Sequence, residues 1–229
     1  MTKQRGGLPE LIILDVGGTL RESTAPTVSS RLIELSPLPN ENVKNIIQHV
    51  LLIAHHGKLP SPNELCAQLD IDPALWPIEC VTAPFEIYPA TIPAVTKLAT
   101  IAPVVTLSNS PAWHAHHHKT LATACSPHLT ALYTSYGLSV PAKPDPAAFH
   151  LISARHNVPP ERIAAVGDRW SVDIVAALNA NIGTIIWTSQ KPNDSPQPQL
   201  ITNGRVHVIN NISDAVPLIE YLTNDTGTA

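Results

Sequence analysis

The chain has 229 residues, of which 44% are hydrophobic and 14% are charged, and its formal net charge is −4. Globular chains carry about 25% charged residues, so this composition excludes disorder caused by charge repulsion. The small negative charge, without any run of Lys or Arg, argues against a nucleic-acid or membrane partner. The length predicts one to two domains with a core that needs no disulfide or metal to fold.

The three cysteines, Cys66, Cys80 and Cys125, are odd in number and form no C-x-x-C pair. This pattern suggests neither a disulfide framework nor a zinc site, and it favours a reducing, cytoplasmic location. The apolar run at residues 11–14 is too short for a signal peptide or a membrane span, so it predicts a buried strand.

Short apolar runs bounded by turn residues predict strands, and from residue 101 onwards helical patterns lie between most of them. Proline and capping residues mark the expected helix starts at Pro111 or Ala112, at Asp145 and at Ser213. The alternation predicts a parallel sheet covered by helices. The expected strands are residues 11–16, 101–107, 164–166, 184–188 and 206–209.

The segment from residue 23 to residue 84 interrupts this alternation, because it shows helical patterns and no strand-like run. One apolar face recurs at helical spacing through residues 42–56. A capping box at Ser61–Glu64 and the pair Asp72-Pro73 predict two more helix starts. We therefore expect a doubly wound α/β core of residues 1–22 and 85–229, with a small helical insert at 23–84.

Residues suited to phosphoryl chemistry follow the predicted strands. Carboxyl ends of parallel strands meet at one edge of a sheet, where ligands bind. A nucleophilic carboxylate, a hydroxyl, an ammonium and two further carboxylates at one edge are what phosphoryl transfer through an aspartyl intermediate with Mg²⁺ needs. These side chains belong to Asp15, Ser108 with the neighbouring Asn109, Lys143, Asp168 and Asp173.

The segments Asp15-Val-Gly-Gly-Thr19-Leu, Thr106-Leu-Ser-Asn109, Lys143-Pro-Asp-Pro and Gly167-Asp-Arg-Trp-Ser-Val-Asp173 occur in this order along the chain. Together they resemble the haloacid dehalogenase (HAD) superfamily of hydrolases, and within it the phosphoglycolate-phosphatase-like subgroup with a helical cap. The resemblance covers nearly the whole chain, and it implies that the insert is the cap.

The resemblance implies a role for each motif residue. Asp15 would be the nucleophile and a Mg²⁺ ligand, and Lys143 would neutralise the phosphoryl group and orient Asp15. The remaining roles divide into two sets. Phosphate contacts would come from Gly18, Thr19, Ser108 and Asn109, and further metal contacts from the Gly17 carbonyl, Asp168 and Asp173, the last directly or through water.

Gly17 departs from the family pattern, because HAD phosphatases usually carry there an aspartate that acts as general acid. The loss of a general acid typically costs about 10²–10⁴ in rate. Three interpretations remain open at this point. The protein is a phosphatase with a replacement acid or an easily departing leaving group, a carbon–phosphorus or carbon–halogen hydrolase, or a binding module without catalysis.

Other interpretations compete for single segments. Residues 15–21 also resemble the first phosphate loop of sugar kinases with the actin-like fold, and Asp168 and Asp173 fit helix caps as well as metal ligands. His55 and His56 are candidates for a replacement acid from the cap. The histidines between His114 and His118 are interpreted as a polar helix face, with a metal site or replacement acid as the alternative.

The motifs together predict a Mg²⁺-dependent hydrolase that acts on a small phosphorylated metabolite. A monomer or homodimer is expected.

Overall fold

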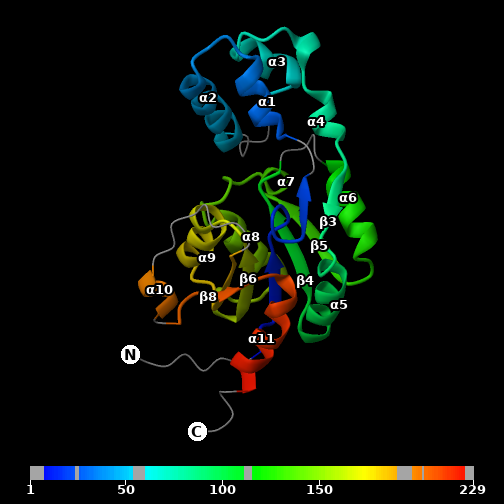
Figure 1. The fold of residues 1–229 in the computed structure, drawn as a ribbon. Coiled ribbons are helices and arrows are strands. Elements are labelled where there is room, and N and C mark those ends of the chain that lie inside the picture. The colour runs from blue at the N-terminus through cyan, green and yellow to red at the C-terminus, as the bar shows by residue number, and fades with distance from the viewer. Residues whose placement is uncertain are drawn as a thin grey trace.

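The structure is a computed structural model, and it describes residues 8–23, 26–53, 60–110, 115–189, 198–202 and 204–224. Six strands form one parallel sheet in the order β5-β4-β1-β6-β7-β8 (Figure 1). This confirms the predicted α/β doubly wound sheet. The strands are β1 (Leu11–Leu14), β4 (Val104–Ser108), β5 (Leu129–Thr134), β6 (Ile163–Gly167), β7 (Thr184–Thr188) and β8 (His207–Ile209).

The centre of the sheet is the point where its strand order reverses. When the six strands are counted along the chain, their spatial order is 3-2-1-4-5-6, so the chain winds outward in both directions from β1. In such sheets ligands bind outside the carboxyl ends of the strands at this switch point. Asp15 follows β1 directly and therefore lies where the topology places a ligand site.

Helices cover both faces of the sheet, and the alternation of side chains along β1 divides the core between them. Leu11 and Ile13 face one hydrophobic cluster, and Ile12 and Leu14 face the other. The first cluster lies under α7 (Ser135–Leu138), α8 (Ala147–His156), the π-helix η5 (Trp170–Ile174) and α9 (Val175–Asn179). The second lies under α5 (Thr91–Ile101), α6 (Ala115–Ala124) and α11 (Ala215–Asn224).

Between β1 and β4 the chain forms a group of helices with its own hydrophobic cluster, which includes Leu32, Val43 and Leu65. As predicted, Ser61 forms a capping box with Glu64, and the Asp72 side chain caps a helical turn. All these helices fall within the predicted insert, and Figure 1 shows them at one end of the molecule. They are α1 (Val28–Leu35), α2 (Asn40–Ile53), α3 (Pro62–Gln68), η2 (Pro73–Leu75) and α4 (Ile78–Thr82).

Three strands were not predicted. Two of them, β2 (Arg21–Ser23) and β3 (Phe85–Ile87), pair antiparallel as a short ribbon. In the chain, β2 precedes the helices of the insert and β3 follows them. The third, β5, lies at an edge of the sheet and is only partly buried. The expected strand at 101–107 begins later, because Ile101 ends α5 and Pro103 separates it from β4.

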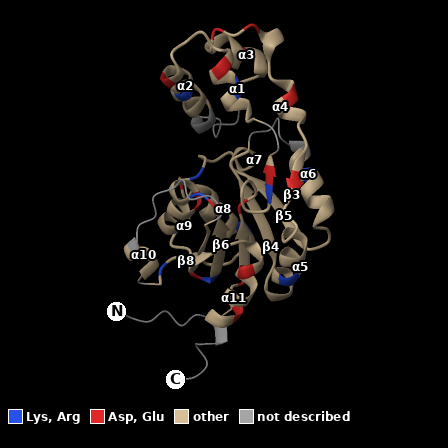
Figure 2. Ribbon diagram, in the orientation of Figure 1, with Lys and Arg blue, Asp and Glu red and all other residues tan. Residues whose placement is uncertain are grey.

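The remaining short helices are η4 (Pro160–Arg162), α10 (Pro198–Thr202) and η6 (Ile212–Asp214). Lys and Arg are scattered along the described chain and form no continuous basic stripe (Figure 2). None of the described helices combines the length and apolarity needed to cross a membrane.

Truncation of the central strand tests this arrangement. Ile13 is 1% exposed, so Ile13→Ala should lower the free energy of unfolding in urea by about 2–5 kcal/mol through lost burial and a residual cavity. Ile92 in α5 is 43% exposed, and Ile92→Ala should cost less than about 1 kcal/mol. Equal losses in the two variants would contradict the placement of β1 at the centre of the core.

Candidate active site

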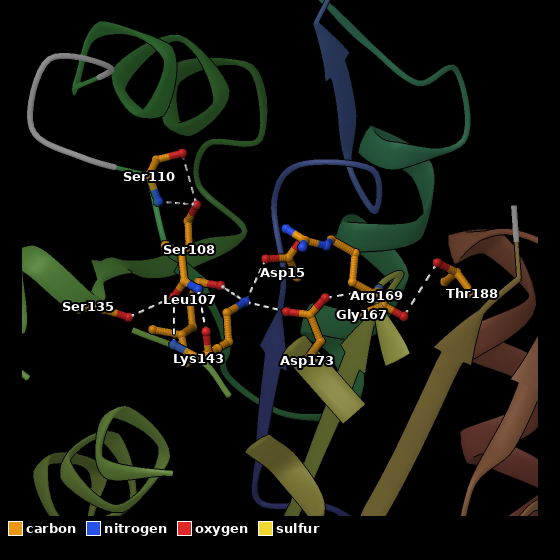
Figure 3. Close-up of polar contacts among 11 residues, drawn as sticks. Asp15, Leu107, Ser108, Ser110, Ser135, Lys143, Gly167, Arg169, Asp173 and Thr188 are labelled. Carbon is orange, nitrogen blue, oxygen red and sulfur yellow. Dashed lines mark hydrogen bonds and ion pairs between the residues drawn. The ribbon is translucent and has the colours of Figure 1, made fainter. Parts of the chain in front are cut away.

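The site is organised around a buried lysine at the carboxyl ends of β1, β4 and β6. The Lys143 ammonium donates to Asp15 Oδ1 at 2.6 Å and to Asp173 Oδ1 at 2.5 Å (Figure 3). It also donates to the Leu107 carbonyl at 3.0 Å. These three acceptors use all three ammonium protons, so the position of the ammonium is fixed.

Asn109 holds the backbone of Lys143 from the neighbouring strand end. Its side-chain Oδ1 accepts the Lys143 N–H at 2.9 Å, and its Nδ2 donates to the Lys143 carbonyl at 2.9 Å. The Ser135 hydroxyl donates to the same Oδ1 at 3.0 Å. Asn109 was predicted to contact phosphate, but its side chain serves to position Lys143. A phosphate contact through its backbone N–H stays a prediction.

The charges of this network shift the pKa values of its members. Burial alone would lower the pKa of Lys143, but the Asp15 and Asp173 carboxylates outweigh this effect and raise it. Burial, together with the Asp173 charge, raises the pKa of Asp15 to about 6 even though Lys143 opposes the shift. Lys143 is therefore charged at every physiological pH, and Asp15 is ionised above pH 6.

Asp168 completes an acidic triad with Asp15 and Asp173. Its side chain is 4% exposed, and its Oδ1 has no hydrogen-bond partner in the described part of the chain. One carboxylate oxygen from each of the three residues lies within 4.8 Å of the others. Burial and the two neighbouring carboxylates raise the pKa of Asp168 to about 7. Three hard oxygen ligands with only one ammonium among them fit a divalent cation such as Mg²⁺.

Two glycines allow the carboxylates to approach the backbone this closely. Gly18 has a φ of +87°, and a Cβ on it would lie 2.0 Å from Asp168 Oδ2. A Cβ on Gly167 would lie 2.4 Å from the Cβ of Asp173. Gly18 therefore serves the acidic triad by leaving room for Asp168, and its phosphate contact stays a prediction.

Gly17 is different, because a Cβ placed on it meets no atom within 4 Å and its φ lies outside the left-handed region. Neither space nor backbone conformation requires glycine here. The position of the missing general acid is thus open to a Cβ atom without rearrangement of its neighbours.

The predicted phosphate contacts lie beside the network. Ser108 is 4% exposed, and its hydroxyl lies 3.1 Å from both the backbone N and the hydroxyl of Ser110. Thr19 is fully buried, and its hydroxyl has no hydrogen-bond partner among the described residues. The roles of both residues toward a phosphoryl group stay predictions.

The second oxygen of Asp173, Oδ2, accepts the Arg169 N–H at 3.0 Å, which ties the π-helix to the end of β6. The Trp187 indole donates to the Asp168 carbonyl at 2.8 Å and holds the same turn from β7. Asp173 therefore supports the site by orienting Lys143 and this turn. Direct or water-mediated metal contact stays a prediction.

The interpretation of the histidines as a polar helix face was wrong for the two whose side chains are described. His117 and His118 are 3% and 8% exposed. His117 Nε2 lies 3.1 Å from the Ala83 carbonyl, and its ring meets the edge of Phe85 at a centroid distance of 4.8 Å. His114, the side chain of His116, and both His55 and His56 lie outside the described residues.

Ser135 was not predicted near the site, and Arg21 was noted only as the end of the segment that resembles a kinase phosphate loop. Ser135 follows β5, a strand that the hydrophobic pattern does not reveal, and Arg21 begins β2, which has only three residues. The signal available for Arg21 was its place in the sequence, directly after the Gly-Gly-Thr-Leu segment that follows Asp15 and Val16.

Comparison with known proteins agrees with this fold. Residues 140–215 match a model of the HAD-hydrolase-like family. No curated protein matches the chain in sequence. A 2-haloacid dehalogenase from Pseudomonas syringae pv. Tomato DC3000 is similar in structure, with a TM-score of 0.62, 19% identity, and coverage of 93% of this chain and 98% of the other.

Two further structures extend the comparison. A HAD phosphatase from Thermococcus onnurineus has a TM-score of 0.61 and 18% identity, over 92% of this chain and 97% of the other. A HAD-hydrolase from Bacillus subtilis, solved with magnesium, has a TM-score of 0.60 and 14% identity, over 93% and 99%. The chain has the HAD-like fold. This fold sets aside the sugar-kinase alternative, and the similar structures include both a dehalogenase and a phosphatase.

The raised pKa values predict how stability depends on pH without a metal ion. Asp15 and Asp168 bind protons more tightly in the folded chain than in the unfolded chain, where an aspartate has a pKa of about 3.9. The free energy of unfolding should therefore rise as the pH falls from 8 to 5, and Asp168→Asn should reduce this rise. Mg²⁺ should stabilise the native protein more at pH 8 than at pH 5.5, because protons compete with it.

Urea denaturation at pH 8 and at pH 5.5, with and without Mg²⁺, measures both the pH dependence of stability and the stabilisation by Mg²⁺. The unfolding free energies of Asp168→Asn are subtracted from those of the native protein, which cancels the contribution of groups outside the acidic triad. One such group is His118, whose lowered pKa makes stability fall as the pH falls. Equal stabilisation by Mg²⁺ at the two pH values would contradict a metal site made of these carboxylates.

Proposed function

We propose that the protein is a Mg²⁺-dependent hydrolase of the HAD superfamily that acts on a small phosphorylated metabolite. The observation that carries this proposal is the pairing of Asp15 with Lys143 beside a carboxylate oxygen of Asp168 that has no partner among the described residues. The pairing orients a nucleophile, and the free oxygen supplies a ligand for a cation.

In the proposed reaction a carboxylate oxygen of Asp15 attacks phosphorus, and the bond between phosphorus and the leaving-group oxygen breaks. Water then attacks the aspartyl phosphate, which releases inorganic phosphate and regenerates the Asp15 carboxylate. Lys143 holds Asp15 Oδ1 and places its positive charge beside the transferring group. Asp15, Asp168 and the Gly17 carbonyl, with Asp173 in support, are the proposed ligands of Mg²⁺, which when bound offsets the charge of the transferring phosphoryl group.

The main alternative is halide displacement from a haloacid, and the acidic triad argues against it. Displacement of a halide needs one nucleophilic aspartate, and additional buried carboxylates would repel both this nucleophile and an anionic substrate. This repulsion is present unless a cation lies beside Asp168, because burial and the charges of Asp15 and Asp173 already raise the pKa of Asp168. A phosphatase makes use of the cation that offsets this repulsion.

The glycine at position 17 restricts the leaving group in this proposal. A carboxylate, whose parent acid has a pKa of about 4, or a phenolate, at about 10, departs far more readily than an alkoxide without prior protonation. We therefore propose that the protein hydrolyses an acyl phosphate or a phosphate ester with a similarly stable leaving group, unless a cap residue donates the proton.

Substitution of the nucleophile tests the reaction. Asp15→Asn should lower kcat for para-nitrophenyl phosphate with Mg²⁺ by about a thousandfold or more, because the amide cannot form the acyl phosphate. Asp145→Asn is the matched control, since the exposed Asp145 side chain only accepts the Ala147 N–H. Equal turnover by native protein and Asp15→Asn would exclude Asp15 as nucleophile, and no turnover by the native protein would favour a binding module.

Restoration of the missing acid tests the role of position 17. Because a Cβ at Gly17 meets nothing within 4 Å, Gly17→Asp should fold normally and raise the turnover of alkyl phosphates by up to about 10²–10⁴. Acetyl phosphate should respond much less, since its leaving group needs no proton. Gly17→Asn controls for side-chain size. A gain shared by Gly17→Asn, or no gain in a folded, Mg²⁺-binding Gly17→Asp protein, would contradict this explanation.

A further inference from the structure

Arg21 lies where the chain leaves the sheet for the helical insert. It is the first residue of β2, and its carbonyl accepts the Gly18 N–H at 2.8 Å. Gly17 forms an isolated β-bridge with it, so Arg21 is held next to the open position of the general acid. Its side chain is turned inward and the residue is 6% exposed, while Glu22 beside it is exposed.

The guanidinium of Arg21 packs on an aromatic ring and has no ion-pair partner among the described residues. Its central carbon lies 4.7 Å from the centroid of the Phe85 ring, and its buried Nε has no hydrogen-bond acceptor. Asp15 contributes a charge nearby, but that carboxylate is already paired with Lys143. Burial of an unpaired cation is costly and lowers the pKa of Arg21.

His118 provides a second buried group without a partner in the same region. It is 8% exposed, and neither of its ring nitrogens has a hydrogen-bond partner in the described chain. Burial, followed by the charges of Arg21 and His117, lowers its pKa to about 4. At neutral pH the imidazole is uncharged and offers one N–H donor. The preceding residue, His117, contacts Phe85, the ring on which the guanidinium packs.

The charge balance of the site explains what these groups are suited to bind. Lys143 and one divalent cation together balance the three carboxylates of the acidic triad, so among buried groups there no positive charge is left over for a bound substrate, and Arg169 beside the triad is exposed. Arg21 is the other buried cation in the described ranges. Its position beside Gly17 places it on the leaving-group side implied by the resemblance to HAD phosphatases.

We propose that Arg21 and His118 form an anion-binding subsite for a second negatively charged group, a carboxylate or a further phosphate, on the leaving group of the substrate. The substrate class is then phosphorylated acids and doubly phosphorylated compounds. The location of this subsite relative to the phosphoryl group rests on the proposed function, whereas its affinity for anions can be measured without turnover.

Stable phosphonates test the subsite by calorimetry with Mg²⁺. Methylphosphonate has one anionic group, while 3-phosphonopropionate adds a carboxylate and propane-1,3-diphosphonate adds a second phosphonate. The native protein should bind at least one of the longer probes about tenfold or more tightly than methylphosphonate, as expected for a charge-assisted hydrogen bond in a buried site. The arm that gains affinity identifies the second anion as carboxylate or phosphate.

The variants assign the gain to Arg21. The ratio compares the Kd of methylphosphonate with the Kd of the longer probe that the native protein prefers. In Arg21→Met this ratio should fall to about one, and Arg21→Lys should restore part of it. Arg155→Met is the matched control, because Arg155 also stacks on a ring, that of Tyr133 at 5.8 Å, but is exposed. Arg169→Met tests the exposed arginine beside the acidic triad, and it should leave the ratio near its native value.

A stability measurement guards against loss of binding through misfolding. Because an unpaired buried cation is removed, Arg21→Met should melt at the same temperature as the ligand-free native protein or higher. The subsite would be overturned if the native protein showed no preference for the longer probes. It would also be overturned if the ratio stayed at tenfold in folded Arg21→Met, or if the ratio fell only in Arg169→Met.

Failure of the subsite and failure of the proposed function are distinguishable. Preference for the longer probes that depends on Arg21, without turnover of any phosphate ester, would retain the subsite and reject the phosphatase. Turnover of para-nitrophenyl phosphate that depends on Asp15, without this preference, would do the reverse. If the native protein binds none of the phosphonates and turns over no phosphate ester, both are rejected.

Discussion

The buried ammonium of Lys143 is the interaction on which the rest of the site depends. Its bonds to Asp15 and Asp173 join the end of β1 to the π-helix that follows β6, and its bond to the Leu107 carbonyl adds β4. Removal of a buried charge from water costs several kcal/mol, and the paired carboxylates offset this cost only in good geometry. The clamp of Asn109 on the Lys143 backbone supplies that geometry. The residues around Lys143 are therefore arranged to hold one charge in place, and Asp15 is oriented as a result.

One ammonium does not balance three carboxylates. Two glycines in the sequence allow the carboxylates to lie this close to the backbone in spite of the imbalance. Gly18 and Gly167 remove the Cβ atoms that would keep Asp168 and Asp173 at a distance. Burial, followed by the repulsion between the carboxylates, raises the pKa values of Asp15 and Asp168. A chain selected for stability alone would not keep such a cluster, since the repulsion destabilises the fold above pH 7. The arrangement becomes favourable when a divalent cation lies among the carboxylates.

The sequence was most informative where local residue types carry the geometry. The buried strand β1 followed by Asp15 could be identified from its apolar run, and Lys143, Asp168 and Asp173 each lie next to a predicted strand or helix end. The strands β2 and β3 have three residues each, too few to show alternation, and they form only because the two ends of the insert meet. The partly buried edge strand β5 likewise lacks a clear apolar pattern.

Side chains whose role depends on contacts between distant segments could not be predicted. Asn109 follows a predicted strand, but its bonds to Lys143 depend on how the loop before α8 folds back onto β4. The burial of His117 and His118 depends on the contact of α6 with Phe85 and Ala83 at the other end of the insert. Their polar type suggested an exposed helix face, whereas tertiary packing placed them inside.

Gly17 and Arg21 gain a common explanation from their adjacency. A phosphatase without a general acid needs a leaving group that is stable as an anion, and such a group interacts favourably with a nearby fixed cation. The guanidinium cannot donate a proton to an alkoxide, because arginine stays protonated in proteins. On the proposed function, the open space at Gly17 and the unpaired charge at Arg21 thus favour the same substrates, those whose leaving group carries its own negative charge. Selection by charge would then replace selection by protonation in this site.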